Sequence, residues 1–125
     1  MSEPILKIDS DTYHEFLIGI TSNEPEYHVA WLLNNTLGWK LSQDNDEVFR
    51  CKIGDTARCA MTQNVLPERV LLKEWKSSDF LLFVSQEGDS VDKSLILKQL
   101  QGVRGIVTAF EIPVNKKILS ALKGL

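Results

Sequence analysis

The sequence predicts an α+β fold, in which two main helices cover one face of an antiparallel sheet. Strand patterns lie towards both ends of the chain, two helix patterns lie between them, and a run of short strands separates the two helices. The chain has 125 residues, of which 43% are hydrophobic and 25% are charged. These values are typical of a globular protein with one core, so we expect a single domain spanning 1–125.

The first strong strand pattern is Tyr13 to Thr21, whose apolar run suits a strand covered on both faces. A short flanking strand is expected before it, at Ile5 to Ile8. A helix should follow, with Asn23 as its cap, Pro25 in its first turn and Gly38 at its end. On a 3.6-residue period, the apolar positions expected to face the sheet are Tyr27, Ala30, Trp31, Leu33 and Leu37, with Val29 and Leu32 widening the face.

A β-hairpin is expected in the middle of the chain, because apolar and polar residues alternate in Val48 to Ile53 and in Ala57 to Thr62. If the turn between them has three residues, Cys51 lies opposite Cys59 and the apolar residues of both strands share one face. A two-residue turn would instead place Cys51 opposite Arg58. The alternation favours the three-residue turn.

The strands on either side of this hairpin are predicted from shorter patterns. Trp39 to Leu41 is expected to form a strand. Asn64 to Trp75 is compatible with a strand or a short helix, and Pro67 argues against an uninterrupted central strand there. Phe80 to Val84 has the continuous apolar character of a buried strand.

The last third of the chain predicts a second helix, a final strand and a short helical tail. Gly88-Asp89-Ser90 should end the buried strand and cap a helix at Val91 to Gln101, and Ile106 to Ile112 should form the final strand. Asn115 is expected to cap a short helix whose inward residues are Ile118, Leu119 and Leu122. This order of elements predicts a ferredoxin-like, split βαβ topology with extra strands in its middle.

The net charge and the distribution of apolar residues argue against several classes of protein. A formal net charge of −3 gives no general attraction for nucleic acid or for an anionic membrane surface. The chain starts without the basic and apolar segments of a signal peptide, and it contains no apolar run long enough to cross a bilayer. The sequence therefore predicts a cytoplasmic protein with no membrane or nucleic-acid partner.

One segment resembles the signature of a known family. Within Leu72 to Val84, Glu74, Asp79 and Phe80 fall on the Glu, Asp and Tyr of the IPExxxVDY family, a group of small bacterial proteins without an assigned activity. Similar stretches occur in the same order around Phe16 to Ser22 and Leu97 to Val103. The resemblance implies a bacterial protein and a shared fold, and it implies no particular chemistry.

Glu74 and Asp79 are the first candidate functional residues. They flank the entrance to the buried strand, and two carboxylates held together by a fold can act in acid–base catalysis or bind a metal ion. The alternative interpretation is structural: Asp79 accepts hydrogen bonds from turn amides, while Glu74 is solvated.

Three further residues complete the candidate functional surface. Asn34 either ties the first helix to a neighbouring backbone or projects into a ligand pocket. His28 could titrate near neutral pH beside a carboxylate, although neither histidine has the spacing of a metal site. Trp75, if exposed, would be a natural contact for a partner protein.

The hairpin contributes two more groups of candidate residues. Cys51 and Cys59 do not match a zinc or dithiol motif and are interpreted as small apolar residues, with a cross-strand disulfide as the alternative. On the other face, Arg50, Lys52 and Arg58 should lie together, and either acidic residues or a bound anion would have to balance their charge.

No cofactor site is predicted, because the glycines at positions 102 and 105 lie between a helix and a strand, whereas a phosphate-binding loop joins a strand to a helix. The leading hypothesis is a non-enzymatic protein-interaction or scaffold domain that binds another protein or itself. The second is a small-molecule-sensing, ferredoxin-like regulatory domain. The third is an enzyme that uses a Glu/Asp pair or His28.

Overall fold

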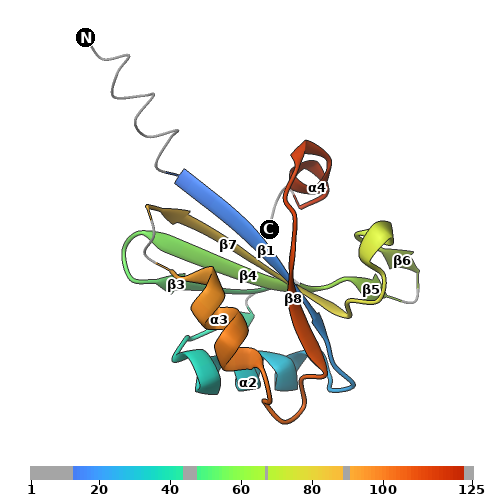
Figure 1. The fold of residues 1–125 in the computed structure, drawn as a ribbon. Helices are drawn as coiled ribbons and strands as arrows, with labels where there is room; N and C mark the ends of the chain where they lie inside the picture. The colour runs from blue at the N-terminus through green and yellow to red at the C-terminus, as the bar shows by residue number, and fades with distance from the viewer. Residues whose placement is uncertain (1–12, 44–47, 67, 89–90, 123–125) are drawn as a thin grey trace.

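The computed structural model describes residues 13–43, 48–66, 68–88 and 91–122. It is an α+β structure built around a six-stranded antiparallel sheet in the order β2-β3-β4-β7-β1-β8 (Figure 1). The six strands are β1 (Tyr13–Thr21), β2 (Ser42–Gln43), β3 (Phe49–Ile53), β4 (Ala57–Gln63), β7 (Phe80–Glu87) and β8 (Thr108–Ile112).

Strand β1 is covered on both faces, as its apolar run predicted. Phe16, Ile18 and Ile20 point to one face and Leu17 to the other, and each is at most 5% exposed. The neighbours of β1 are β7 and β8. The strand expected at Ile5 to Ile8 lies outside the described residues.

The two main helices, α2 (Glu26–Leu37) and α3 (Lys93–Leu100), pack on the same face of the sheet, below it in Figure 1. Their buried residues join the first core cluster, together with side chains from β1, β4 and β7. The main contributors from the helices are Val29, Leu33, Ile96 and Leu100. This confirms the predicted arrangement of two main helices on one face.

A second, smaller cluster lies on the opposite face of the sheet. The short helix α4 (Lys116–Ala121) and the 3-10 helix η1 (Lys73–Trp75) lie on this side, and the hairpin of β5 (Val65–Leu66) and β6 (Arg69–Val70) leads from β4 to η1. Its buried members are Leu17, Leu72, Leu81, Ile112, Ile118 and Leu122. Asn115 caps α4 by accepting a hydrogen bond from the amide of Ile118 at 2.9 Å, as predicted.

The hairpin of β3 and β4 has the predicted three-residue turn. Cys51 is directly opposite Cys59, and Lys52 is directly opposite Arg58. Alternation therefore gave the correct register, because a shift of one residue would have turned the apolar residues away from the helices.

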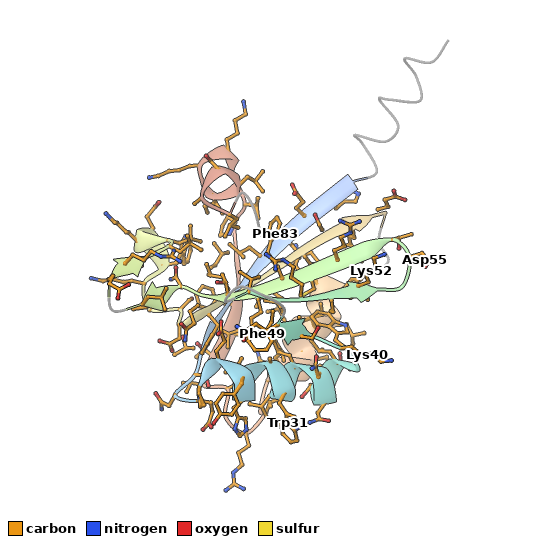
Figure 2. The ribbon with its side chains drawn as sticks, turned by 180° about the vertical axis from the view of Figure 1, so that it is seen from behind. Trp31, Lys40, Phe49, Lys52, Asp55 and Phe83 are labelled. Atoms are coloured by element: carbon orange, nitrogen blue, oxygen red, sulfur yellow. The ribbon has the colours of Figure 1, made fainter. Side chains whose placement is uncertain are left out.

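The apolar face predicted for α2 is wrong at two positions. Tyr27 is 70% exposed and Trp31 is 59% exposed, whereas Val29, Ala30 and Leu33 are buried against the sheet. Figure 2 shows Trp31 on the side of α2 that faces away from the sheet. Because both edges of the helix carry apolar residues, periodicity alone allowed more than one orientation.

The starts of both main helices also differ from prediction. Pro25, rather than Asn23, is the N-cap of α2, and it makes no side-chain capping bond. Asp92 caps α3 by accepting hydrogen bonds from the amides of Ser94 and Leu95. The expected cap residues at 89 and 90 lie outside the described residues.

Two strand predictions need correction. No strand forms at Trp39 to Leu41, where the backbone leads instead into β2 at Ser42–Gln43. The final strand begins at Thr108 rather than at Ile106. The ambiguous stretch from Asn64 to Trp75 contains both kinds of structure, a two-stranded hairpin and a 3-10 turn.

Candidate functional site

The five predicted site residues do not gather at one place. His28 and Asn34 lie on α2, which covers one face of the sheet, whereas Glu74 and Trp75 belong to η1, which lies with α4 on the other face. Asp79 lies just before β7. The fold therefore brings no acid–base pair together from these residues.

The carboxylates of Glu74 and Asp79 have separate partners. Glu74 is exposed and forms a surface ion pair with Lys117 of α4, at 3.3 Å between Oε1 and Nζ. Oδ2 of Asp79 accepts a hydrogen bond from the amide of Ser22 at 2.9 Å, at the point where β1 ends. Glu74 is solvated, as the structural interpretation expects, but Asp79 bonds the amide of Ser22 at the end of β1 instead of the amides of its own turn.

Asn34 ties α2 to the segment that follows it. Its Oδ1 accepts from the amide of Leu41 at 2.8 Å, and its Nδ2 donates to the carbonyl of Leu41 at 3.2 Å. His28 lies near Glu24, with 3.3 Å between Nδ1 and Oε1, and its ring meets Trp31 edge to face. Both groups lie on the surface of α2 rather than in a common cavity.

Trp75 is half-buried and packs against Phe110, with 5.7 Å between the ring centres. It borders the second core cluster. Trp75 therefore contributes to the packing of this cluster, and it is not the exposed partner contact that the sequence suggested.

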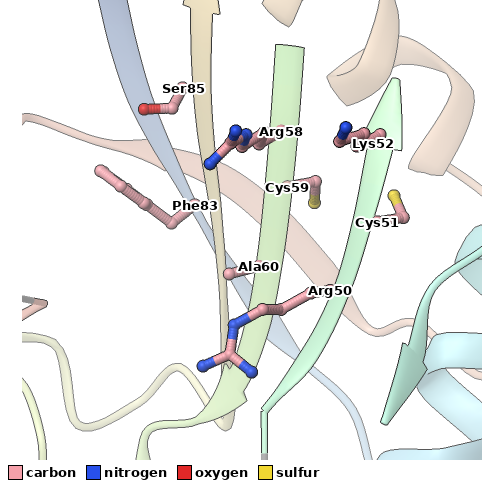
Figure 3. Close-up of a pocket in the computed structure, with 8 residues that line it drawn as sticks. All are labelled: Arg50, Cys51, Lys52, Arg58, Cys59, Ala60, Phe83 and Ser85. Carbon is pink, nitrogen blue, oxygen red and sulfur yellow. The ribbon is translucent and has the colours of Figure 1, made fainter. Parts of the chain in front are cut away.

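A different set of side chains forms a shallow hollow on the sheet face opposite the main helices. We call it the basic hollow; it has a volume of about 570 Å³ and is lined by Arg50, Cys51, Lys52, Arg58, Cys59, Ala60, Phe83 and Ser85 (Figure 3). The side chains of both cysteines point to the other face, because residues 51 and 59 alternate with the basic ones. The cysteines therefore contribute their backbone to the hollow.

The pairing of the strands builds the hollow from two rows. In one row, Arg50, Ala60 and Phe83 lie side by side on β3, β4 and β7. In the next row, the neighbours are Lys52, Arg58 and Ser85. Ala60 has the smallest of these side chains, and Figure 3 shows the longer side chains of Phe83 and Arg50 on the strands at either side of it.

The second core cluster covers only part of this face. Its described members come from β1, β7 and β8 and from the segments above them, and none comes from β3 or β4. Phe83 packs against the cluster and also lines the hollow, so it forms the border between the covered and open halves. Figure 2 places Phe83 on the side of the sheet away from α2.

The hollow concentrates positive charge. Lys52 and Arg58 are directly opposite on adjacent strands, where like charges destabilise a sheet. Within the described part of the chain, neither forms an ion pair, although Asp55 and Glu87 line a neighbouring depression with them. The site can therefore attract an anion.

Sequence reasoning identified the three basic residues but missed the rest of the hollow. Phe83 was assigned only to a buried strand, and Ala60 only to the hairpin. The missing information is the pairing of β4 with β7, which no local pattern specifies. The available signal was the small residue Ala60, which lies two positions after Arg58 and opposite Arg50 in the predicted hairpin register.

Other kinds of site find no support in the described residues. These residues contain no group of three or more side chains able to hold a metal ion. None of the described helices has the length and apolar character needed to cross a lipid bilayer. No protein-family model matches the chain, and no similar protein is found among curated sequences or solved structures.

Proposed function

We propose that this chain is a non-enzymatic binding domain whose basic hollow holds a small organic anion. The observation that carries the proposal is the direct opposition of Lys52 and Arg58 beside Phe83 and Ala60. An anionic group would offset the repulsion between the two cations. The ring of Phe83 and the methyl group of Ala60 offer apolar surface to the remainder of the ligand.

The lining of the hollow, with basic residues beside Phe83, favours a small molecule with both a charged and a planar part. A volume of about 570 Å³ is within the range of ligand pockets. Aryl phosphates and aromatic carboxylates have the required combination of charge and ring. This proposal takes up the second hypothesis from the sequence, a domain that binds a small molecule, and assigns the binding to the residues of the basic hollow.

The experiment is a titration with phenyl phosphate, followed by amide chemical shifts in nitrogen–proton NMR spectra. We expect the shifts to concentrate at residues 50–60 and 83–85, and to be weaker with inorganic phosphate or benzyl alcohol, which each lack half of the ligand. Lys52→Ala and Arg58→Ala should each weaken the binding.

The matched control is Lys98→Ala, which removes an exposed lysine from α3 on the other face. It should bind phenyl phosphate like the unaltered protein. Shifts scattered over the surface, or equal binding by the Lys52→Ala and Lys98→Ala variants, would contradict the proposal.

We also propose that the fold is a ferredoxin-like, split βαβ arrangement extended by β2 and β3. The strand order β4-β7-β1-β8 supports it, with α2 leading from β1 to the β3–β4 hairpin and α3 joining β7 to β8. Folds of this kind host many unrelated functions, so the analogy is one of architecture alone.

A relationship to the IPExxxVDY family remains our proposal, together with a bacterial, cytoplasmic origin. Its support is the segment from Leu72 to Val84 and the order of the two similar stretches. A solved structure of a family member provides the test. The proposal expects the equivalent of Asp79 to bond the end of the first strand, and a different topology would overturn it.

A second candidate function is self-association through α2. Tyr27 and Trp31 are one helical turn apart and are both largely exposed, which is unusual for aromatic residues on a monomer surface. A two-fold axis across α2 would bring each aromatic pair onto its copy. Glu24, which lies just before α2, is 3.3 Å from His28 beside this aromatic pair.

Sedimentation velocity over a range of protein concentrations tests this second function. We expect a dimer that Trp31→Ala dissociates. Leu95→Ala is the control, because Leu95 is an exposed apolar residue of α3. A protein that stays monomeric at every concentration would rule out the dimer and leave the anion-binding proposal unaffected.

A further inference from the structure

The two cysteines of the chain form a cross-strand pair on the helix-facing side of the β3–β4 hairpin. Cys51 and Cys59 are directly opposite each other, and both are free thiols. Cys51 is half-buried at the edge of the core, while Cys59 is 2% exposed. Figure 3 shows their sulfur atoms on the two neighbouring strands.

The hydrogen bonds around the pair give the two sulfur atoms different characters. The Cys59 thiol donates a hydrogen bond to Sγ of Cys51 and is the main cause that lowers the pKa of Cys51 to about 7. The backbone amide of Lys40 donates to the same sulfur and contributes less. Burial raises the pKa of Cys59, so the negative charge resides on Cys51 and the proton on Cys59.

We propose that Cys51 and Cys59 are a hydroperoxide-reactive thiol pair, in which Cys51 is the attacking sulfur and Cys59 closes a cross-strand disulfide. Cys51 is the partly exposed residue of the pair, so it is the one that an oxidant can reach. The buried sulfur lies beside it, as a resolving thiol must. This inference does not depend on the proposed function.

The reaction consumes one hydroperoxide for each disulfide. The Cys51 thiolate attacks a peroxide oxygen, the O–O bond breaks, and hydroxide (or the alkoxide of an organic peroxide, which water then protonates) leaves, so that Cys51 becomes a sulfenic acid. Sγ of Cys59 then attacks the sulfenic sulfur, the S–O bond breaks, and water leaves with the thiol proton. With hydrogen peroxide, two thiols are oxidised by two electrons and the peroxide is reduced to two waters.

The backbone spacing is suitable for this disulfide. Directly opposite residues on antiparallel strands have Cα atoms about 4.5 to 5.5 Å apart. Disulfides span Cα separations of about 4.4 to 6.8 Å. The bond can therefore form without moving the strands apart.

The test exposes the folded, fully reduced chain to one equivalent of hydrogen peroxide at pH 7 and follows its intact mass. We expect loss of two hydrogen atoms, with peptide mapping linking Cys51 to Cys59. We expect the native protein to react about three- to tenfold faster than the same chain in urea, since a lowered pKa increases the thiolate fraction more than it reduces nucleophilicity.

Two variants assign the roles of the sulfur atoms. Cys59→Ala should accumulate a sulfenic acid at Cys51 that dimedone traps, because the resolving thiol is absent. Cys51→Ser should react slowly in the folded state, because Cys59 is buried. Circular dichroism and urea unfolding of both variants establish that they fold.

Three results would overturn the inference. The first is a native protein that reacts no faster than the unfolded chain. The second is oxidation that yields dimers linked between chains instead of an internal disulfide. The third is a folded Cys51→Ser variant that reacts as fast as the unaltered protein.

Discussion

The buried side-chain amide of Asn64 donates a hydrogen bond to the main-chain carbonyl of Trp75, with 2.8 Å between nitrogen and oxygen. The same amide also donates to the carbonyls of Ser78 and Leu72, and its oxygen accepts from the amide of Leu72 at 2.7 Å. One side chain thus holds the whole connection between β6 and β7.

Replacing Asn64 should be costly. We expect Asn64→Ala to lower the free energy of unfolding by about 2 to 4 kcal/mol, because it leaves several buried backbone groups without their partner. Urea unfolding measures the change. Asn35→Ala, an exposed position on α2, should cost far less, and equal losses in the two variants would show that these hydrogen bonds contribute little.

The two candidate carboxylates should have different effects on stability. Asp79→Ala removes the acceptor of the Ser22 amide, and we expect a loss of about 1 to 2 kcal/mol. Glu74→Ala breaks an exposed ion pair and should cost between about 0 and 1 kcal/mol. Thermal and urea unfolding compare the variants, and a larger loss for Glu74→Ala would refute this assignment.

Gly19 of β1 leaves room for a neighbouring buried serine. A Cβ atom at position 19 would collide with Oγ of Ser78 and would lie 2.9 Å from Cδ1 of Ile112. We therefore expect Gly19→Ala to destabilise the fold by about 1 to 3 kcal/mol. Adding Ser78→Ala should restore part of that loss in a double-mutant cycle, whereas strictly additive effects would argue against the contact.

The cation pair of the basic hollow should reduce stability when no anion is bound. We expect Lys52→Glu to stabilise the protein by about 0.2 to 1 kcal/mol at low salt, because it replaces repulsion across β3 and β4 with attraction. Salt should shrink the gain through screening. Lys98→Glu serves as the control, and an equal gain from it would attribute the effect to net charge.

The thiol pair predicts a pH dependence of stability. Folding lowers the pKa of Cys51 from its ordinary 9.0 to about 7. A lowered pKa stabilises the fold above the unfolded value, and that stabilisation is lost as the pH falls through the folded value. The difference in unfolding free energy between the unaltered protein and Cys51→Ser should therefore grow from pH 7 to pH 9. A constant difference would show that the pKa is unshifted.

The sequence was most informative where a residue pattern was compatible with a single structure. Alternation in the β3–β4 hairpin, together with its short turn, predicted the register of Cys51 opposite Cys59, because a shift of one residue would expose the apolar residues. It was less informative for α2, where Tyr27 and Trp31 counted as apolar although both are exposed. Aromatic residues with polar atoms satisfy a hydrophobic pattern without requiring burial.

The candidate site could be predicted only in part, because it depends on contacts between distant segments. The three basic residues share one face by alternation alone. The position of Phe83 beside Ala60 requires the pairing of β4 with β7, and the structural role of Asn64 requires a loop that folds back around it. Neither the strand pairing nor the path of this loop can be predicted from neighbouring residues in the sequence.

Asn64, Asn34 and Gln86 are side-chain amides of the described residues that act in the same way. Each accepts from the backbone amide of one residue in the following loop and donates to that residue's carbonyl: Leu72, Leu41 and Val91, respectively. These contacts are made to main-chain atoms, so they do not depend on which side chain the loop residue carries. Leu41, Leu72 and Val91 are nevertheless fixed by burial in the core, so substitutions are tolerated at the exposed loop positions and not at these three or at the amides that hold them.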